Sequence, residues 1–286
     1  MDDAVDLLIQ RSRELEDAGN YAGARRAAEE AVALGGGGRA KARLAGVERS
    51  ERRPREALDL LAGETAPEAA AERAAALEQL ARFDEAEAAL AGLESDDPYV
   101  VQSVLLTRAA IARGRGDYAA AESELRTAIA HADRTFGPDA LETAQPINSL
   151  GMTFKYSGRF DEGLEVYHRA LAIVEGRFGE LHPDVASLHH NLGGLEHARR
   201  NFAAAEPHAR KSVEIRRALN SPDDPAVAED EAAWAPILHA LGRDDETEAP
   251  SCKPAATSTV RTTPTGGRWR RSSAPSGRTI RRPRSR

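Results

Sequence analysis

The segment GRFDEGLEVYHRALAIVEGRFGELHPD, residues 158–184, carries a pattern that recurs earlier and later in the chain. Its aromatic residue follows a short turn and opens a helix-like run, and equivalent residues stand 42 positions apart at Tyr118, Phe160 and Phe202. Other columns keep the same step: Phe136/Phe178, Gly137/Gly179, Leu150/Leu192, Gly151/Gly193 and Pro183/Pro225. Most residues between these columns change, so side-chain size and polarity are what repeat. A fixed period of this kind indicates stacked structural repeats.

Each repeat unit is predicted to contain two helices. In residues 160–174, apolar or small side chains recur every three or four positions, which places them on one face of an α-helix. Gly158 and Gly179 suit the left-handed conformation that ends a helix, and Pro183 suits the first turn of the next one. No segment alternates with a period of two, so we expect no sheet. One pair cannot bury its apolar stripe alone, whereas stacked pairs bury a continuous core.

The recurring columns resemble the tetratricopeptide repeat. The resemblance rests on a Leu-Gly pair in the first helix, then an aromatic residue, a small residue and an alanine in the second: Leu150-Gly151, Leu192-Gly193, Phe160, Gly163 and Ala170. The 42-residue step is similar to that of the repeats found in kinesin light chains and many bacterial proteins. Two departures are Arg108, where leucine is usual, and Ala233-Trp234 in the Asn191-Leu192 columns. The resemblance implies an all-α fold, a right-handed α-solenoid of stacked antiparallel helix pairs.

The sequence divides into three segments. Residues 1–97 show the same helix openings at irregular steps, at Tyr21, Pro54 and Phe83, and are predicted to form degenerate repeats with Gly35–Gly38 as a flexible joint. Residues 98–249 carry the 42-residue repeats. Residues 250–286 are rich in Ser, Pro and Arg, cannot bury a core, and are predicted to be a disordered tail. A native basic tail and a frameshifted reading frame both account for this change of composition.

Charge and composition narrow the class of protein. All 46 acidic residues lie at or before Glu248, whereas the 38 residues after it carry ten basic residues and no acidic one. No run reaches the ~18 apolar residues of a membrane span, and the acidic start lacks the features of a signal peptide. Cys252 is the single cysteine, so no internal disulfide forms. We therefore expect a cytoplasmic protein without a membrane partner.

Motifs that carry catalysis or bind metal are missing from the sequence. GxSxG, HExxH, GxxxxGK[ST] and CxxC do not occur, so we expect neither an enzyme nor a cofactor. The HPD tripeptide at 182–184 is interpreted as a helix start, because Pro and Asp favour the first turn. His189, His190 and His197 lie within two helical turns without the spacing of metal ligands, and are interpreted as exposed side chains.

The resemblance implies a protein–protein interaction scaffold or adaptor that binds a peptide or protein segment on its concave face, without catalysis. Carrying the first-helix positions of tetratricopeptide relatives onto this sequence gives the candidates Gln145, Asn148, Ser149, Met152, Lys155, Tyr156, Ser187, His190, Asn191 and His197. Asn and Lys suit the amides and carboxylates of a bound chain, and a solvated helix face is the other interpretation of each position. The alternative function is a nucleic-acid-associated or regulatory protein that acts through its basic tail, since clustered arginines bind phosphates.

Overall fold

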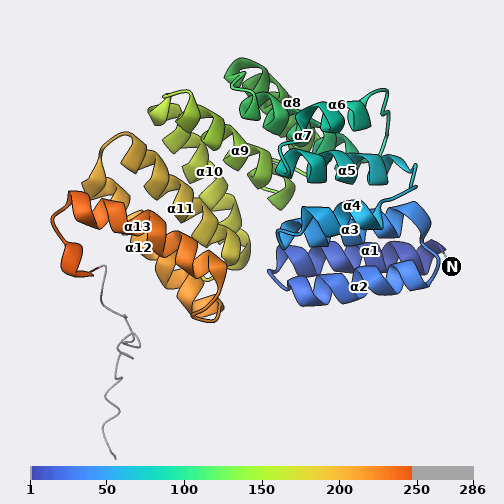
Figure 1. Ribbon diagram of the computed structural model, residues 1–286, viewed down its shortest axis with the longest axis horizontal. Coiled ribbons are helices and arrows are strands. Elements are labelled where there is room, and N and C mark those ends of the chain that lie inside the picture. Colours follow the sequence, from blue (N-terminus) through green and yellow to red (C-terminus); the bar gives the residue numbers. More distant parts are fainter. Residues whose placement is uncertain (1, 247–286) are drawn as a thin grey trace, which may run out of the picture. The chain divides into compact units, whose positions relative to one another are not determined.

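The computed structural model describes residues 2–246, and within this range the chain forms helices and no strand (Figure 1). The described α-helices are α1 (Asp2–Asp17), α2 (Tyr21–Ala33), α3 (Gly37–Ser50), α4 (Pro54–Leu60), α5 (Pro67–Gln79), α6 (Phe83–Leu90), α7 (Pro98–Gly114), α8 (Tyr118–Thr135), α9 (Leu141–Tyr156), α10 (Phe160–Phe178), α11 (Pro183–Ala198), α12 (Phe202–Leu219) and α13 (Pro225–Ala240). A short 3-10 helix, η1 (Asp244–Glu246), follows them. None of these helices is both long and apolar enough to cross a membrane. The predicted disordered tail, residues 250–286, lies outside the described residues.

The helices stack as antiparallel pairs. Each even-numbered helix packs against the odd-numbered helices before and after it in the chain. The odd-numbered helices also contact one another in succession from α1 to α13, so the first helices of the pairs form one continuous row. This row continues through residue 97, because α5 and α7 contact each other. The solenoid of stacked pairs that the repeat predicts is therefore confirmed.

The recurring aromatic and proline columns mark the starts of the second helices. The helices α2, α4, α6, α8, α10 and α12 begin at Tyr21, Pro54, Phe83, Tyr118, Phe160 and Phe202. Gly158 and Gly179 flank α10 with a φ of 77° each, a conformation that costs glycine little. Pro183 opens α11, and the ring nitrogen Nδ1 of His182 accepts the backbone N–H of Asp184 at 3.2 Å. The HPD tripeptide is thus a helix start, as predicted.

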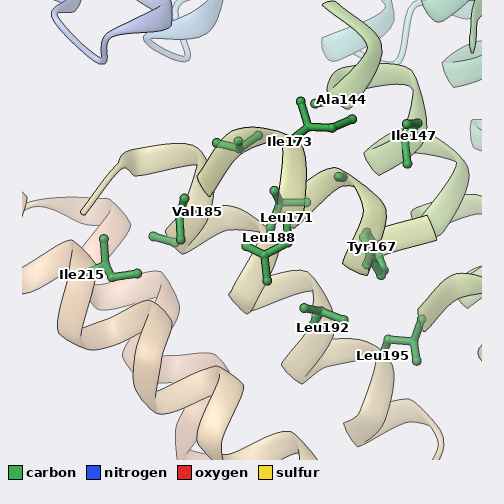
Figure 2. Packing of buried hydrophobic residues seen from close by; sticks show 13 residues of the cluster. Ala144, Ile147, Tyr167, Leu171, Ile173, Val185, Leu188, Leu192, Leu195 and Ile215 are labelled. Atoms are coloured by element: carbon green, nitrogen blue, oxygen red, sulfur yellow. The ribbon is translucent and has the colours of Figure 1, made fainter. Parts of the chain in front are cut away.

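The core between α9, α10 and α11 explains why small residues recur in the repeat. Tyr167 of α10 is fully buried, and a Cβ atom on Gly151 would lie 2.6 Å from its ring atom Cε1. A Cβ atom on Gly163 would lie 2.5 Å from Cδ1 of Leu195. Figure 2 shows Tyr167, Leu192 and Leu195 gathered between these helices. Glycine at position 151 therefore leaves room for the Tyr167 ring, and glycine at position 163 leaves room for the end of the Leu195 side chain.

The glycine run at residues 35–38 is not the flexible joint that the sequence predicts. Gly37 and Gly38 belong to the first turn of α3, and Gly36 is the residue before it. Gly36 packs tightly, since a Cβ atom there would lie 2.7 Å from Val5 Cγ1 and from Ala40 Cβ. Gly35 has a φ of 84° and lies in the turn after α2. The run therefore builds a tight α2–α3 turn, and the flexible-joint interpretation is wrong.

Candidate functional site

The row of odd-numbered helices borders a cavity of about 580 Å³. Side chains of α1, α3, α5, α7, α9 and α11 line it, together with Tyr21 from α2 and with Val174 and Phe178 from α10. Successive first helices of the repeat thus present one inner surface. Because carboxylates, guanidinium groups, amides and hydroxyls hold many of the lining positions, this surface can make directional hydrogen bonds with a bound molecule.

Four of the ten predicted binding residues line this cavity: Gln145, Asn148, Ser149 and Ser187. A fifth, Asn191 of α11, reaches them through its side-chain Nδ2, which donates to Oδ1 of Asn148 on α9 at 2.8 Å. The two asparagines belong to neighbouring pairs and stand 43 positions apart, one more than the repeat step. Their amides keep further donor and acceptor capacity free. The structure therefore brings these five residues together on the inner surface.

The other five predicted residues do not line the cavity. Met152 packs against the core of α9–α11, and Tyr156 is 55% exposed at the end of α9. Lys155 lies over Gly194, where burial lowers the pKa of its ammonium group. His197 places its ring 5.5 Å from that of Phe202. His190 bonds a buried carboxylate, described next.

Asp230 is a buried acidic residue that sequence reasoning missed. It is 5% exposed on α13, and its Oδ1 lies 2.7 Å from Nδ1 of His190. Burial opposes its ionisation, but hydrogen bonds from His190 and from the hydroxyl of Ser212 hold the pKa of Asp230 below its usual value. The signal for it was present, because Asp230 stands 42 positions after Leu188, a buried core residue. A carboxylate in a leucine column indicates a polar network that fixes His190.

The three neighbouring histidines of α11 do not meet. His190 bonds Asp230 and His197 contacts Phe202, whereas His189 pairs with His208 of α12 through their Nδ1 atoms, 3.0 Å apart. The side chain of His189 is only 12% exposed, so its interpretation as an exposed residue is wrong. Among residues 2–246, no group of three or more His, Cys, Asp or Glu side chains is arranged to hold a metal ion.

Two distant segments meet beside the cavity. Nε2 of His182, in the turn before α11, donates to the backbone carbonyl oxygen of Asp17 at the end of α1, at 2.8 Å. Gly19 lies against the ring of Pro183, since a Cβ atom on Gly19 would lie 3.0 Å from its Cγ. The first helix pair therefore contacts the start of α11, although 165 residues separate Asp17 from His182.

This contact gathers the carboxylates of Asp17, Glu142 and Asp184 on the cavity lining. Burial first, and then the charges of Glu142 and Asp184, raise the pKa of Asp17 to about 6. Burial also raises the pKa of Asp184, against the influence of nearby His182. Tyr99 directs its hydroxyl at Oε1 of Glu142, 3.4 Å away. Glu142 and Asp184 stand one repeat step of 42 residues apart, but nothing in the sequence places Asp17 beside them, because α1 belongs to a distant pair.

The arginines of the cavity lining, in contrast, have partners. Arg43 pairs with Glu16, and Arg49 pairs with Glu72 at 3.1 Å. The guanidinium group of Arg13 lies over the ring of Tyr99, 3.9 Å from its centre. The positive charge of the lining is thus neutralised or stacked, whereas the three gathered carboxylates form no ion pair with lysine or arginine in the described part of the chain.

Comparison with known families identifies the repeat. Residues 101–162 and 147–218 match the family described as the tetratricopeptide repeat. Residues 101–218 carry tetratricopeptide repeats. The two matched segments span α7 to α12, where the 42-residue columns were found, so the resemblance seen in the sequence is confirmed. No curated protein matches the chain.

Two solved structures with TM-scores of 0.50 and 0.57 share the helical fold over most of this chain. BtubC (BKLC) from P. vanneervenii is 20% identical, with 86% of this chain and 87% of that chain covered and a TM-score of 0.50. A chain of the APC/C hetero-tetramer Cut9-Hcn1 is 15% identical, with 81% of this chain and 42% of that chain covered and a TM-score of 0.57. A putative kinesin light chain from Podosopora anserina is 18% identical, with 73% and 89% covered and a TM-score of 0.45.

Proposed function

We propose that this tetratricopeptide protein is a scaffold that binds an extended polypeptide segment along its inner surface. The observation that carries the proposal is the cavity itself, which successive first helices line with hydrogen-bonding side chains. An extended polypeptide offers a backbone donor and acceptor at every residue, and an Asn or Gln side chain can satisfy both. The linked pair Asn148 and Asn191 places such amides on adjacent helices, in line with one another.

The five inner-surface residues are the centre of the proposed binding site. Gln145, Ser149 and Ser187 flank the asparagine pair on the cavity lining. Met152, Lys155, Tyr156, His190 and His197 stay predictions that rest on the family resemblance. The alternative, a nucleic-acid-binding role, rests on the basic tail and thus lies outside the described residues.

A display experiment tests this proposal. The full-length protein selects binders from a random peptide library, and their affinity is then measured for variants of each surface. We expect the Asn148→Ala/Asn191→Ala double variant to lose about tenfold or more in affinity, about 1.4 kcal/mol, while stability changes by only about 0.5 kcal/mol.

The matched control is Arg169→Ala/Lys211→Ala on second helices α10 and α12. Arg169 pairs with Asp133 at 3.2 Å and Lys211 with Glu180 at 2.7 Å, away from the cavity lining. Binding that survives the asparagine variant and disappears in this control would place the site on the outer face and contradict the proposal.

A further inference from the structure

One end of the cavity collects carboxylates that form no ion pair with lysine or arginine in residues 2–246. Asp17 ends α1, Glu142 lies in the first turn of α9, and Asp184 lies in the first turn of α11. All three line the cavity, and Asp17 and Asp184 are exposed to it. We call these three residues the acidic cluster.

The three carboxylates repel one another in the folded protein. The pKa of Asp17 is raised first by burial and then by the charges of Glu142 and Asp184, with Arg13 and Arg177 only partly opposing them. The nearest ion-pair partner of Asp184 in residues 2–246 is Nδ1 of His182, at 3.9 Å. Folding therefore assembles like charges from three helices, and Arg13, Arg177 and Arg216 act on them without forming an ion pair. Such an arrangement is more typical of binding sites than of structural ones.

A second observation indicates that a hydrogen-bond donor is missing beside this cluster. Gln102 of α7 lines the cavity and is only 6% exposed. Its Nε2 donates to the backbone carbonyl oxygen of Glu142 at 2.6 Å, while its Oε1 is buried without any hydrogen-bond partner. Buried carbonyl oxygens of this kind are nearly always satisfied. An acceptor without a donor next to three acceptor carboxylates favours a ligand that brings both positive charge and several N–H groups.

We propose that the acidic cluster of Asp17, Glu142 and Asp184 binds a basic side chain, arginine above lysine, of the polypeptide held in the cavity. The inference rests on the proposed function and adds the chemical class of its partner. A guanidinium group carries five N–H donors in one plane and a permanent charge, so it can serve carboxylates and the Gln102 oxygen together. The ring of Tyr21, which also lines the cavity, supplies a flat surface against which such a group packs.

The paired arginines elsewhere in the cavity set the direction of a bound segment. Arg43 and Arg49 of α3 have their own glutamates, so that part of the lining is near neutral. The part where α1, α9 and α11 meet gathers three carboxylates without an ion pair to lysine or arginine in residues 2–246, whereas α5 adds a single such carboxylate, Glu78, to the lining. A segment therefore binds with its basic residue at this end and with its backbone along Gln145 and Asn148.

The test uses peptides selected from the random library by the full-length protein. We expect arginine or lysine to be enriched at one fixed position. Replacing that residue by citrulline, which keeps the shape of arginine without its charge, is expected to weaken binding at least about tenfold, with the loss shrinking in high salt. The Asp17→Asn/Asp184→Asn variant is expected to bind the arginine and citrulline peptides alike. The matched control, Glu165→Gln on an exposed position of α10, is expected to change nothing.

Each other outcome is decisive. Selected peptides that lack a basic residue, or that bind equally with citrulline, would overturn the acidic-cluster assignment. If the same peptides still lose affinity in the Asn148→Ala/Asn191→Ala variant, the proposed function stands while the charge assignment falls. Peptide binding that none of the inner-surface variants affects, or a selection without binders, would contradict both. Calorimetric binding of spermine or Mg²⁺ at the cluster, without any effect on peptide affinity, would assign it to small cations instead.

Discussion

Asp17 illustrates how a single side chain can oppose folding. Its pKa is raised to about 6 in the folded protein, from a usual value of 3.8. The folded state therefore binds a proton more tightly than the unfolded state, and the resulting penalty is absent below pH 4 and complete above pH 6. Charge that destabilises the fold and yet lines the cavity fits a role in binding.

Asp17→Asn is accordingly expected to stabilise the protein. The gain at pH 7.5 is about 1 kcal/mol once screening of this exposed carboxylate is allowed for. Urea denaturation of both proteins, followed by circular dichroism from pH 7.5 to 4.5, measures it. The two curves should converge as the pH falls. Equal stability of the wild type and Asp17→Asn at pH 7.5 would show that the charge of Asp17 does not destabilise the fold.

The His189–His208 pair titrates in the opposite sense. Burial first, then the charges of His208 and Lys211, lower the pKa of His189 from 6.5 to about 4, and burial also lowers that of His208. One Nδ1 donates to the other at 3.0 Å, which two imidazolium ions cannot do. The groups around the pair are His168 and Glu175 of α10, Glu180 of the next turn, Glu196 of α11 and Lys211 of α12.

Protonation of His189 should therefore weaken the α11–α12 contact. Its contribution is present above pH 6.5 and is lost as the pH falls toward 4, by at most about 3 kcal/mol. His189→Gln keeps a polar side chain that does not titrate, so the wild type should lose more stability than this variant between pH 7 and 4.5. Parallel curves for the two proteins would contradict the assignment. Asp17→Asn is the comparison with the opposite sign, because the wild type is expected to gain stability relative to that variant as the pH falls.

At the scale of the element, the packing of α9 against α10 depends on the Tyr167 ring and on the absence of a side chain at Gly151. Tyr167 is fully buried, so Tyr167→Ala is expected to cost about 3–5 kcal/mol. Its hydroxyl has no hydrogen-bond partner, so Tyr167→Phe should leave stability unchanged within about 0.5 kcal/mol or raise it. Gly151→Ala drives a methyl group into the ring and should cost about 1–3 kcal/mol.

Thermal unfolding of these three variants measures how much the α9–α10 contact stabilises the protein. A large loss of stability in Tyr167→Phe would contradict this prediction, because it would show that the Tyr167 hydroxyl makes a stabilising hydrogen bond. Gly176→Ala is the control for the glycine variant, because a Cβ atom on Gly176 of α10 meets nothing within 4 Å. It should stabilise the helix, since alanine is the better helix former.

The elements themselves were largely predictable from the sequence. An aromatic residue at a helix start is local information, and it marked α8, α10 and α12 without knowledge of the partners. The glycine run at 35–38 was misread for the same reason. Its close contact with Val5 depends on α1, which the local composition cannot show. Likewise, nothing in α11 alone indicates that His189 turns to α12 while His190 turns to α13.

At the scale of the molecule, the repeat predicts only contacts between neighbouring pairs, because its columns encode the packing of one unit on the next. Gln145, Asn148 and Asn191 belong to such neighbours: the first two line the cavity, and Asn191 donates to Asn148. Asp17 meets α11 only because the row of helices brings two non-adjacent pairs together. That meeting has no period in the sequence, so the position of Asp17 beside Glu142 and Asp184, which stand 42 residues apart, could not be predicted.

His182 provides the contact between these non-adjacent pairs. Its Nδ1 accepts the N–H of Asp184, so Nε2 carries the proton and donates to the carbonyl oxygen of Asp17. Its ring also stacks on Phe178, with 4.1 Å between ring centres. In a solenoid stabilised only by neighbouring repeats, α1 and α2 would open independently of α11. The His182 contact should couple them.

The variant His182→Asn tests the contact with Asp17 separately from the role of residue 182 in starting α11. Asparagine can still accept the N–H of Asp184, because it is a good N-cap residue, but its shorter side chain cannot reach Asp17. The lost hydrogen bond and ring contact together amount to about 1.4 kcal/mol. Native-state hydrogen exchange should therefore speed up about tenfold in α1 and α2 while the first turn of α11 keeps its protection. His168→Asn, at an exposed histidine of α10, is the control. Unchanged exchange in α1 and α2 would show that the first pair is held by α3 alone, and an equal rise throughout the chain would indicate a general loss of stability rather than the release of one contact.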